Sequence, residues 1–85
     1  MPYVTVYYQG HKVEFVEGLG DVPNFYWLVE QNGESFKVSR ILTETKGIYK
    51  YDLYSVGVNG KWRFQEQDIV SLDAVARVIC DTVYV

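Results

Sequence analysis

The stretch over residues 26–38, YWLVEQNGESFKV, decides the fold because it places Asn32-Gly33 between two runs of alternating apolar residues. Asn-Gly favours a type I′ turn, which joins two antiparallel strands through a two-residue loop. A loop of this length fixes which residues oppose each other, so the register can be checked against the alternation. The two agree and predict a β-hairpin. The expected opposed pairs are Val29 with Phe36 and Trp27 with Val38.

Two further dipeptides, Gly10-His11 and Asn59-Gly60, are predicted to be hairpin corners of the same kind. Gly at the first corner position suits a type II′ turn, and Asn-Gly suits a type I′ turn. Apolar residues alternate on both sides of each corner, so Trp62 and Phe64 are expected to face the core. The expected opposed pairs are Tyr8 with Val13, Val6 with Phe15, Trp62 with Gly57 and Phe64 with Ser55.

Strands are predicted on both sides of each corner and wherever apolar residues alternate between turn residues. The third strand has large apolar side chains on both faces, which indicates a central strand that is covered twice. The segment before it, residues 17–24, contains two Gly and one Pro and is read as a connecting loop. The expected strands cover residues 3–9, 12–16, 25–31, 34–42, 48–56 and 61–65.

After Glu66 the apolar period changes from that of a strand to that of a helix. Ser71 or Asp68 is expected to cap the helix start by accepting a hydrogen bond from a free amide. The sequence therefore predicts one α+β domain over residues 1–85. It is an antiparallel meander of five to six strands, open or coiled into a half-barrel, with one C-terminal amphipathic helix on one face. The helical stripe comprises Leu72, Val75, Ala76, Ile79 and Val83.

The composition is that of a small globular domain rich in aromatic residues. Eight Tyr, four Phe and two Trp occur among 85 residues. The net charge of −3 argues against a dedicated duplex-DNA binder, which would show a basic face. One cysteine excludes an internal disulfide and is compatible with a reducing cytosol. No signal peptide and no membrane-spanning apolar run is recognised, so we expect a cytoplasmic protein with no membrane partner.

The apolar strand surface exceeds what one helix can cover. Six strands spaced about 4.8 Å apart span roughly 25–30 Å, whereas a helix is about 10–12 Å in diameter. We therefore expect the rest to be buried by coiling of the sheet, by a second copy of the chain or by a partner protein. The candidate interaction surface comprises Tyr3, Tyr7, Tyr26, Leu28, Ile48, Tyr54 and Val56.

His11 and Cys80 are the side chains best suited to chemistry, and both have simpler explanations. His11 is the only histidine and has no second ligand at metal-binding spacing, so it is interpreted as a turn residue. Cys80 borders the apolar stripe of the helix, which favours a buried apolar side chain over a reactive thiol.

Two other patterns resemble ligand-binding sites but lack features that such sites require. Gly18-Leu19-Gly20-Asp21 leads into a strand, whereas a phosphate loop leads into a helix. Glu66, Asp68 and Asp73 lie near the helix start, where the helix dipole favours carboxylates, and they form no calcium-loop pattern. No catalytic residue, metal or cofactor is therefore expected.

The first alternative function is the binding of single-stranded nucleic acid by stacking and charge on the face away from the helix. The total of eight Lys and Arg is low for this role, and Asp52 interrupts the same face. The residues it would use are Tyr3, Tyr7, Tyr54, Lys37, Lys50 and Arg63.

The second alternative is a small-ligand pocket inside a half-barrel, between Trp27, Phe36, Trp62 and the helix. The function that the sequence favours is neither of these, because the surplus of apolar strand surface points to protein contacts. We expect a non-enzymatic protein-binding module that forms a homodimer. Its size and charge would suit an inhibitor or accessory factor of viral or mobile-element type.

Overall fold

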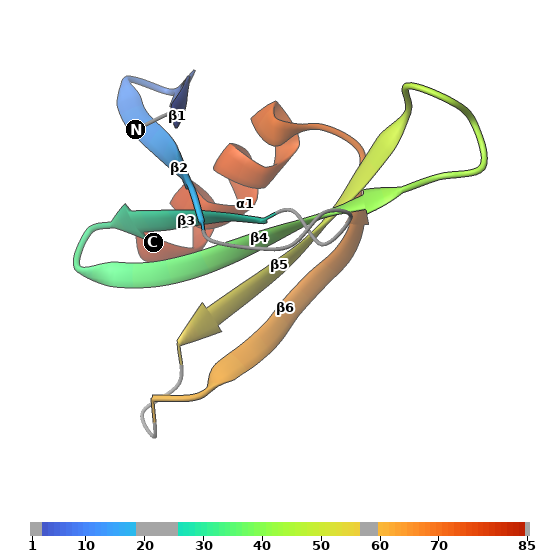
Figure 1. Ribbon diagram of the computed structural model, residues 1–85. Helices are drawn as coiled ribbons and strands as arrows, with labels where there is room; N and C mark the ends of the chain where they lie inside the picture. The colour runs from blue at the N-terminus through green and yellow to red at the C-terminus, as the bar shows by residue number, and fades with distance from the viewer. Residues whose placement is uncertain (1–2, 19–25, 57–59, 85) are drawn as a thin grey trace.

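The computed structural model describes residues 3–18, 26–56 and 60–84, which form one antiparallel sheet and one C-terminal helix (Figure 1). The elements are β1 (Tyr3–Tyr8), β2 (His11–Glu17), β3 (Tyr26–Gln31), β4 (Glu34–Leu42), β5 (Tyr49–Val56), β6 (Trp62–Ile69) and α1 (Leu72–Val83). The strands follow one another across the sheet in chain order. The predicted α+β meander with a C-terminal helix is confirmed. Within the described ranges β1 and β6 do not pair, so the sheet is open and these strands are its edges.

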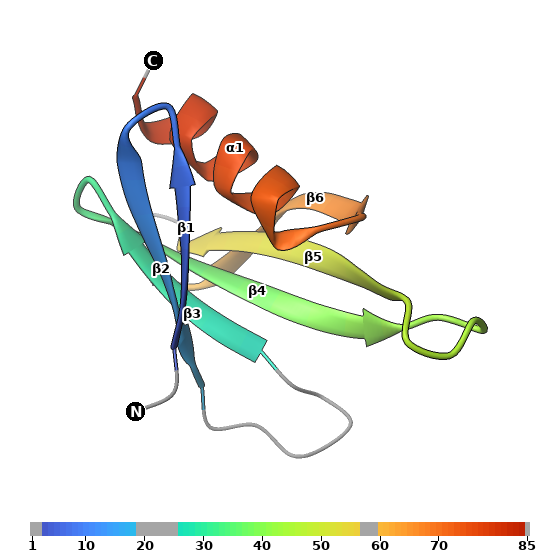
Figure 2. The same cartoon turned by 90° about the horizontal axis from the view of Figure 1, so that it is seen from above.

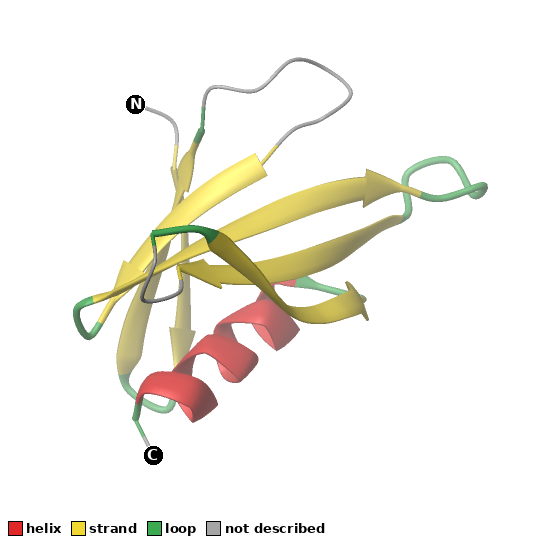
Figure 3. Cartoon of the chain, turned by 90° about the horizontal axis from the view of Figure 1, so that it is seen from below, coloured by secondary structure: helices red, strands yellow, loops and turns green. Residues whose placement is uncertain are grey.

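The apolar stripe of α1 packs on one face of this sheet (Figures 2 and 3). Val75, Ala76, Ile79 and Cys80 are its buried residues, at the predicted helical spacing. Ile79 is fully buried, as are Phe15 and Phe36 from the sheet. We call the face that packs against α1 the inner face and the opposite face the outer face. The core residues from the strands are Val13, Phe15, Trp27, Val29, Phe36, Val38, Leu53 and Ile69.

The helix start is fixed by one of the two predicted caps. The hydroxyl of Ser71 accepts a hydrogen bond from the backbone N–H of Ala74 at 3.1 Å. Asp68 instead belongs to β6, where its own backbone N–H donates to the Asp52 carboxylate at 3.3 Å. The cap satisfies one of the amides that the first helical turn leaves without an intrahelical partner.

The helix end is fastened to the sheet by three contacts. The ring of Tyr84 stacks on His11, with centroids 3.8 Å apart and planes 9° apart. The side-chain amide of Gln31 donates to the Tyr84 hydroxyl at 2.8 Å. The side-chain amide of Asn32 donates to the Val83 carbonyl at 2.8 Å. His11 is thus the first residue of β2 and a helix contact, which corrects its interpretation as a turn residue.

The hairpin between β3 and β4 has the predicted register. Asn32 and Gly33 both have positive φ, as a type I′ turn requires. Turn chemistry and apolar alternation therefore select the same structure. The observed pairs are Trp27 with Val38 and Val29 with Phe36.

The first hairpin turns one residue earlier than predicted. Gln9 and Gly10, with φ of 49° and 82°, occupy the corner in place of Gly10-His11. Two positive φ values match a type I′ turn instead of the expected type II′ turn. Because opposed residues shift by two, every side chain keeps its predicted face. The observed pairs are Tyr8 with His11 and Val6 with Val13, where Tyr8 with Val13 and Val6 with Phe15 were predicted.

The last hairpin differs from the prediction by one residue, which reverses the side chains of β6 beside the turn. The β5–β6 ladder has register irregularities on both sides of Leu53, and Asp68 has a φ of 57°. The one-residue difference does not arise from these irregularities, because it is already present at Val56–Trp62, the described pair nearest the turn. The predicted corner residue Asn59 and the predicted partner Gly57 lie outside the described residues. In the observed register Trp62 and Phe64 lie on the outer face, 43% and 53% exposed. They oppose Val56 and Tyr54, where Gly57 and Ser55 were predicted.

Replacing Ile79 with Ala is expected to lower the free energy of unfolding by about 2–5 kcal/mol, because the side chain is fully buried between helix and sheet. Urea unfolding followed by circular dichroism measures this change. Arg77→Ala, on the exposed side of the same helix, is the control and should change stability by less than about 0.5 kcal/mol. A loss for Ile79→Ala no larger than that of the control would show that α1 is not seated as described.

Candidate interaction surface

One row of side chains crosses the outer face from edge to edge. Each strand contributes one residue, because each member opposes the next across a strand pair. Five of the six are aromatic or aliphatic, and the sixth is a lysine. We call this set the open-face row. It comprises Tyr3, Val16, Leu28, Lys37, Tyr54 and Phe64.

Lys37 lies in the middle of this row and joins aromatic rings from three strands. Its ammonium nitrogen is 5.4 Å from the ring centre of Tyr26, 5.4 Å from that of Tyr54 and 6.0 Å from that of Trp62. Tyr54 also contacts Phe64 edge to face, with ring centres 5.6 Å apart. A cation over an aromatic face contributes about 0.5–1 kcal/mol at an exposed site. The outer face thus carries an ordered aromatic cluster around one charge, which we call the Lys37 cluster (Tyr26, Lys37, Tyr54, Trp62 and Phe64).

Six of the seven residues of the predicted interaction surface lie on the outer face of the sheet, and the seventh, Ile48, does not. Ile48 precedes β5 and belongs to the β4–β5 turn, where its backbone N–H donates to the Thr45 carbonyl at 3.1 Å. Among the six, Tyr3 and Tyr7 are the most exposed, at 62% and 70%. The six residues on the outer face are Tyr3, Tyr7, Tyr26, Leu28, Tyr54 and Val56.

The sequence prediction missed several residues of the same surface. Trp62 and Phe64 were assigned to the core because a two-residue corner at Asn59-Gly60 predicts a register one residue away from the observed one. Val16 belongs to the surface through its pairing with Leu28, which no turn motif predicts. Leu28 is 41% exposed, so β3 is covered on its inner face alone within the described chain. The prediction that this strand is covered twice is therefore corrected.

Charges on the outer face have both signs. Lys12 and Glu14 form an ion pair at 2.8 Å on β2. The hydrogen bond from Lys12 to the Glu14 carboxylate raises the pKa of the lysine, and the charge of Glu14 adds to this. Lys50 and Asp52 alternate with Tyr54 on the outer side of β5. The outer face is therefore apolar and mixed in charge, and it lacks the uniformly basic character of a duplex-binding surface.

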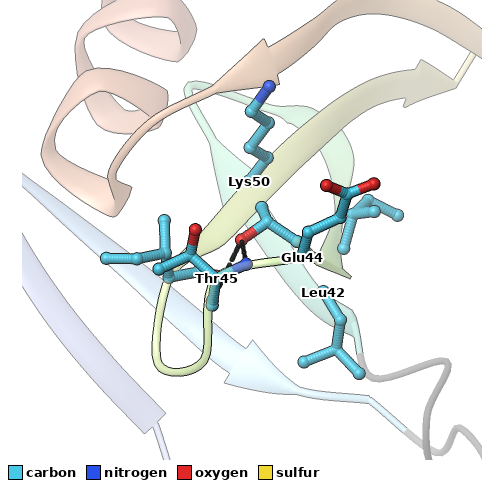
Figure 4. Close-up of a pocket in the computed structure, with 7 residues that line it drawn as sticks. Leu42, Glu44, Thr45 and Lys50 are labelled. Carbon is cyan, nitrogen blue, oxygen red and sulfur yellow. Dashed lines mark hydrogen bonds between the residues drawn. The ribbon is translucent and has the colours of Figure 1, made fainter.

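A shallow hollow of about 520 Å³ lies at the β4–β5 turn, away from the Lys37 cluster (Figure 4). Thr43 organises this turn: its hydroxyl donates to the Ile48 carbonyl at 2.8 Å and accepts from the Thr45 backbone N–H at 3.3 Å. In Figure 4 the side chains of Glu44 and Lys50 both extend toward the top of the view, whereas that of Leu42 points toward the bottom. The hollow is lined by Ile41, Leu42, Thr43, Glu44, Thr45, Ile48 and Lys50.

The residues expected to line a half-barrel pocket do not share a cavity. Trp27 and Phe36 are buried on the inner face, 7% and 0% exposed, whereas Trp62 lies on the outer face. The sheet therefore separates Trp62 from the other two. Of the predicted loop Gly18-Leu19-Gly20-Asp21, Gly18 alone is among the described residues, and its N–H donates to the Tyr26 carbonyl at 2.9 Å.

Cys80 is packed as a small apolar residue, as predicted, with 3% exposure. Burial raises the pKa of its thiol, and the neighbouring charge of Asp81 raises it further. Burial likewise raises the pKa of the Tyr51 hydroxyl. The described residues contain no group of three or more His, Cys, Asp or Glu that could hold a metal ion. Within the same ranges, no helix combines the length and apolar character that crossing a bilayer requires.

Comparison with known proteins does not assign this chain to a family: no family model matches it, and no curated protein or solved structure is significantly similar to it.

Proposed function

We propose that this chain is a non-enzymatic protein-binding module that offers the apolar, tyrosine-rich outer surface of its sheet to a partner protein and that also self-associates. The observation that carries the proposal is the open-face row, which runs from edge to edge of the sheet on the side that α1 does not cover. A small acidic module of this kind suits an inhibitor or accessory factor, of the type carried by a virus or a mobile element, that acts in the cytoplasm.

The energetic support comes from large side chains that remain in water in the single chain. Leu28, Val56 and Phe64 are 41%, 42% and 53% exposed on neighbouring parts of the outer face. An aromatic side chain has roughly 150–250 Å² of surface, so covering the exposed half of Phe64 contributes about 2–3 kcal/mol at ~25 cal/mol per Å². Contiguous exposed apolar surface of this kind is typical of protein contact sites.

Among the described residues, the side chains best suited to catalysis are engaged in packing, which favours a binding function. His11 is engaged in stacking with Tyr84. Cys80 is buried, with a pKa raised by that burial, whereas a nucleophilic thiol needs a lowered pKa and access to solvent. Tyrosine is abundant on the outer face and Trp62 also lies there, and both residue types are ones that protein interfaces favour.

A second copy of the chain is the partner for which the proposal is tested. Sedimentation velocity at micromolar concentrations is expected to show a dimer, and Tyr3→Ser combined with Tyr7→Ser is expected to raise the dissociation constant at least tenfold. These side chains are the most exposed aromatics of the outer face. Leu42→Ser, 60% exposed at the far end of β4, is the matched control and should leave association unchanged. A chain that stays monomeric at every concentration would contradict the proposal.

The Lys37 cluster favours one alternative function, the binding of single-stranded nucleic acid. Three rings around one ammonium group resemble the combination of stacking and charge that such sites use. Arg63, expected to contribute, opposes Ser55, whose neighbour Tyr54 faces outward. It therefore lies on the inner side of the sheet.

A labelled oligothymidine at low salt tests this alternative by fluorescence anisotropy. If it is correct, the oligonucleotide binds in a salt-dependent manner, and Tyr54→Ala weakens binding at least tenfold by removing a stacking ring. Tyr49→Ala, on the inner side of the same strand, is the control and should not alter it. Absence of binding at low salt would eliminate nucleic acid as the ligand.

A further inference from the structure

The edge strand β1 contains a palindrome. Residues 3–7 read Tyr-Val-Thr-Val-Tyr, which is the same sequence in both directions. Within the described residues β1 pairs with β2 alone, and in Figure 2 no other ribbon passes in front of it. The strand contains no charged residue, no Gly and no Pro. Charged side chains and proline are among the usual means by which proteins prevent an edge strand from pairing with another chain.

An antiparallel pair of two such strands about a two-fold axis matches every residue with one of its own kind. If the axis passes through Thr5, Tyr3 opposes Tyr7 of the second copy and Val4 opposes its Val6. Thr5 then opposes Thr5 of the second copy. Aromatic pairs, β-branched pairs and Thr–Thr pairs are the cross-strand combinations that stabilise antiparallel sheets.

The exposure of β1 agrees with this register. Tyr3 and Tyr7 are 62% and 70% exposed on the outer face, and Val4 is 40% exposed on the inner face. All three would gain a neighbour from the second copy. A shift of one residue would set outward tyrosines against inward valines, so the faces of the two sheets restrict the register. The charges on β2 next to this edge, Lys12 and Glu14, already neutralise each other within one chain.

The other edge of the sheet is unsuited to the same contact. β6 contains Arg63, Glu66 and Asp68, and its ladder with β5 is irregular. Asp68 also has a positive φ, which bends the strand locally. Charged side chains and bulges both oppose edge-to-edge pairing. β1 is therefore the edge available to a second copy.

On the basis of the self-association proposed above, we propose that two copies of this chain join by antiparallel pairing of their β1 strands, with Thr5 on the two-fold axis. The same surface of both copies forms the contact, as a closed dimer requires. Backbone hydrogen bonds between the two β1 strands hold the copies together, and the matched side chains determine which residues oppose each other. The two six-stranded sheets then form one continuous sheet, with both outer faces on the same side.

Disulfide cross-linking tests the register directly in a Cys80→Ala background. Directly opposed residues have Cα atoms about 4.5–5.5 Å apart, within the range of a disulfide. Thr5→Cys chains are therefore expected to form a covalent dimer on mild oxidation. Tyr7→Cys chains alone are the matched control, because two residues at position 7 would lie four residues apart along the strands, roughly 14 Å. Mixing Tyr3→Cys with Tyr7→Cys chains is expected to restore cross-linking.

A charge placed on the axis tests the same contact without a covalent bond. Thr5→Lys sets two like charges against each other between copies, while Glu14 opposes position 5 within each chain and supports its folding. The dissociation constant of the dimer is expected to rise at least tenfold in sedimentation velocity. Gln67→Lys on β6, an exposed residue of the other edge, should not change it.

The outcomes separate the two proposals. A dimer in solution whose Thr5→Cys form cross-links no faster than the Tyr7→Cys form would overturn the pairing of β1 strands and leave self-association standing. A chain that is monomeric at all concentrations would overturn both. Cross-linking by Thr5→Cys and by the mixed chains, with none by Tyr7→Cys alone, would establish the register.

Discussion

The packing of α1 against one face of the sheet is the constraint on which the rest of the structure depends. Its buried residues close the core over the inner face, and the contacts of Tyr84 with His11 and Gln31 hold its end against β2 and β3. Because the described part of the chain has one helix for six strands, the opposite face is left with large side chains in water. That asymmetry makes the outer face the part of the molecule most suited to binding.

The two proposals concern connected parts of this surface. Tyr3 belongs both to the open-face row and to the palindromic edge, so a dimer joined through β1 would extend the row of one copy into the sheet of the next. The Lys37 cluster would remain uncovered and would occur twice on the same side of the joined sheet. Two identical sites on one surface can bind a repetitive or two-fold symmetric target more tightly than either site alone.

The sequence was sufficient where turn chemistry and burial both restricted the register. Asn32-Gly33 and the alternation around it predicted two pairs of the β3–β4 hairpin, and both are observed. At the first corner two turn types were compatible with Gly10, and the pairs moved by two without changing faces. In β6 every residue from Trp62 to Asp68 is exposed, so burial did not select a face there, and a register one residue away from the predicted one reversed Trp62 and Phe64. The stacking of His11 on Tyr84 joins residues far apart in the chain, and no local pattern predicts it.

The two tryptophans report on whether the sheet has one covered and one open face. Trp27 lies on the inner face and is 7% exposed, whereas Trp62 lies on the outer face and is 43% exposed. Trp27→Phe and Trp62→Phe each leave one tryptophan, whose emission wavelength and quenching by acrylamide can be compared in the dissociated chain. Red-shifted, strongly quenched emission is expected from Trp62, and blue-shifted, protected emission from Trp27. Equal protection of both tryptophans would contradict this division into a covered and an open face.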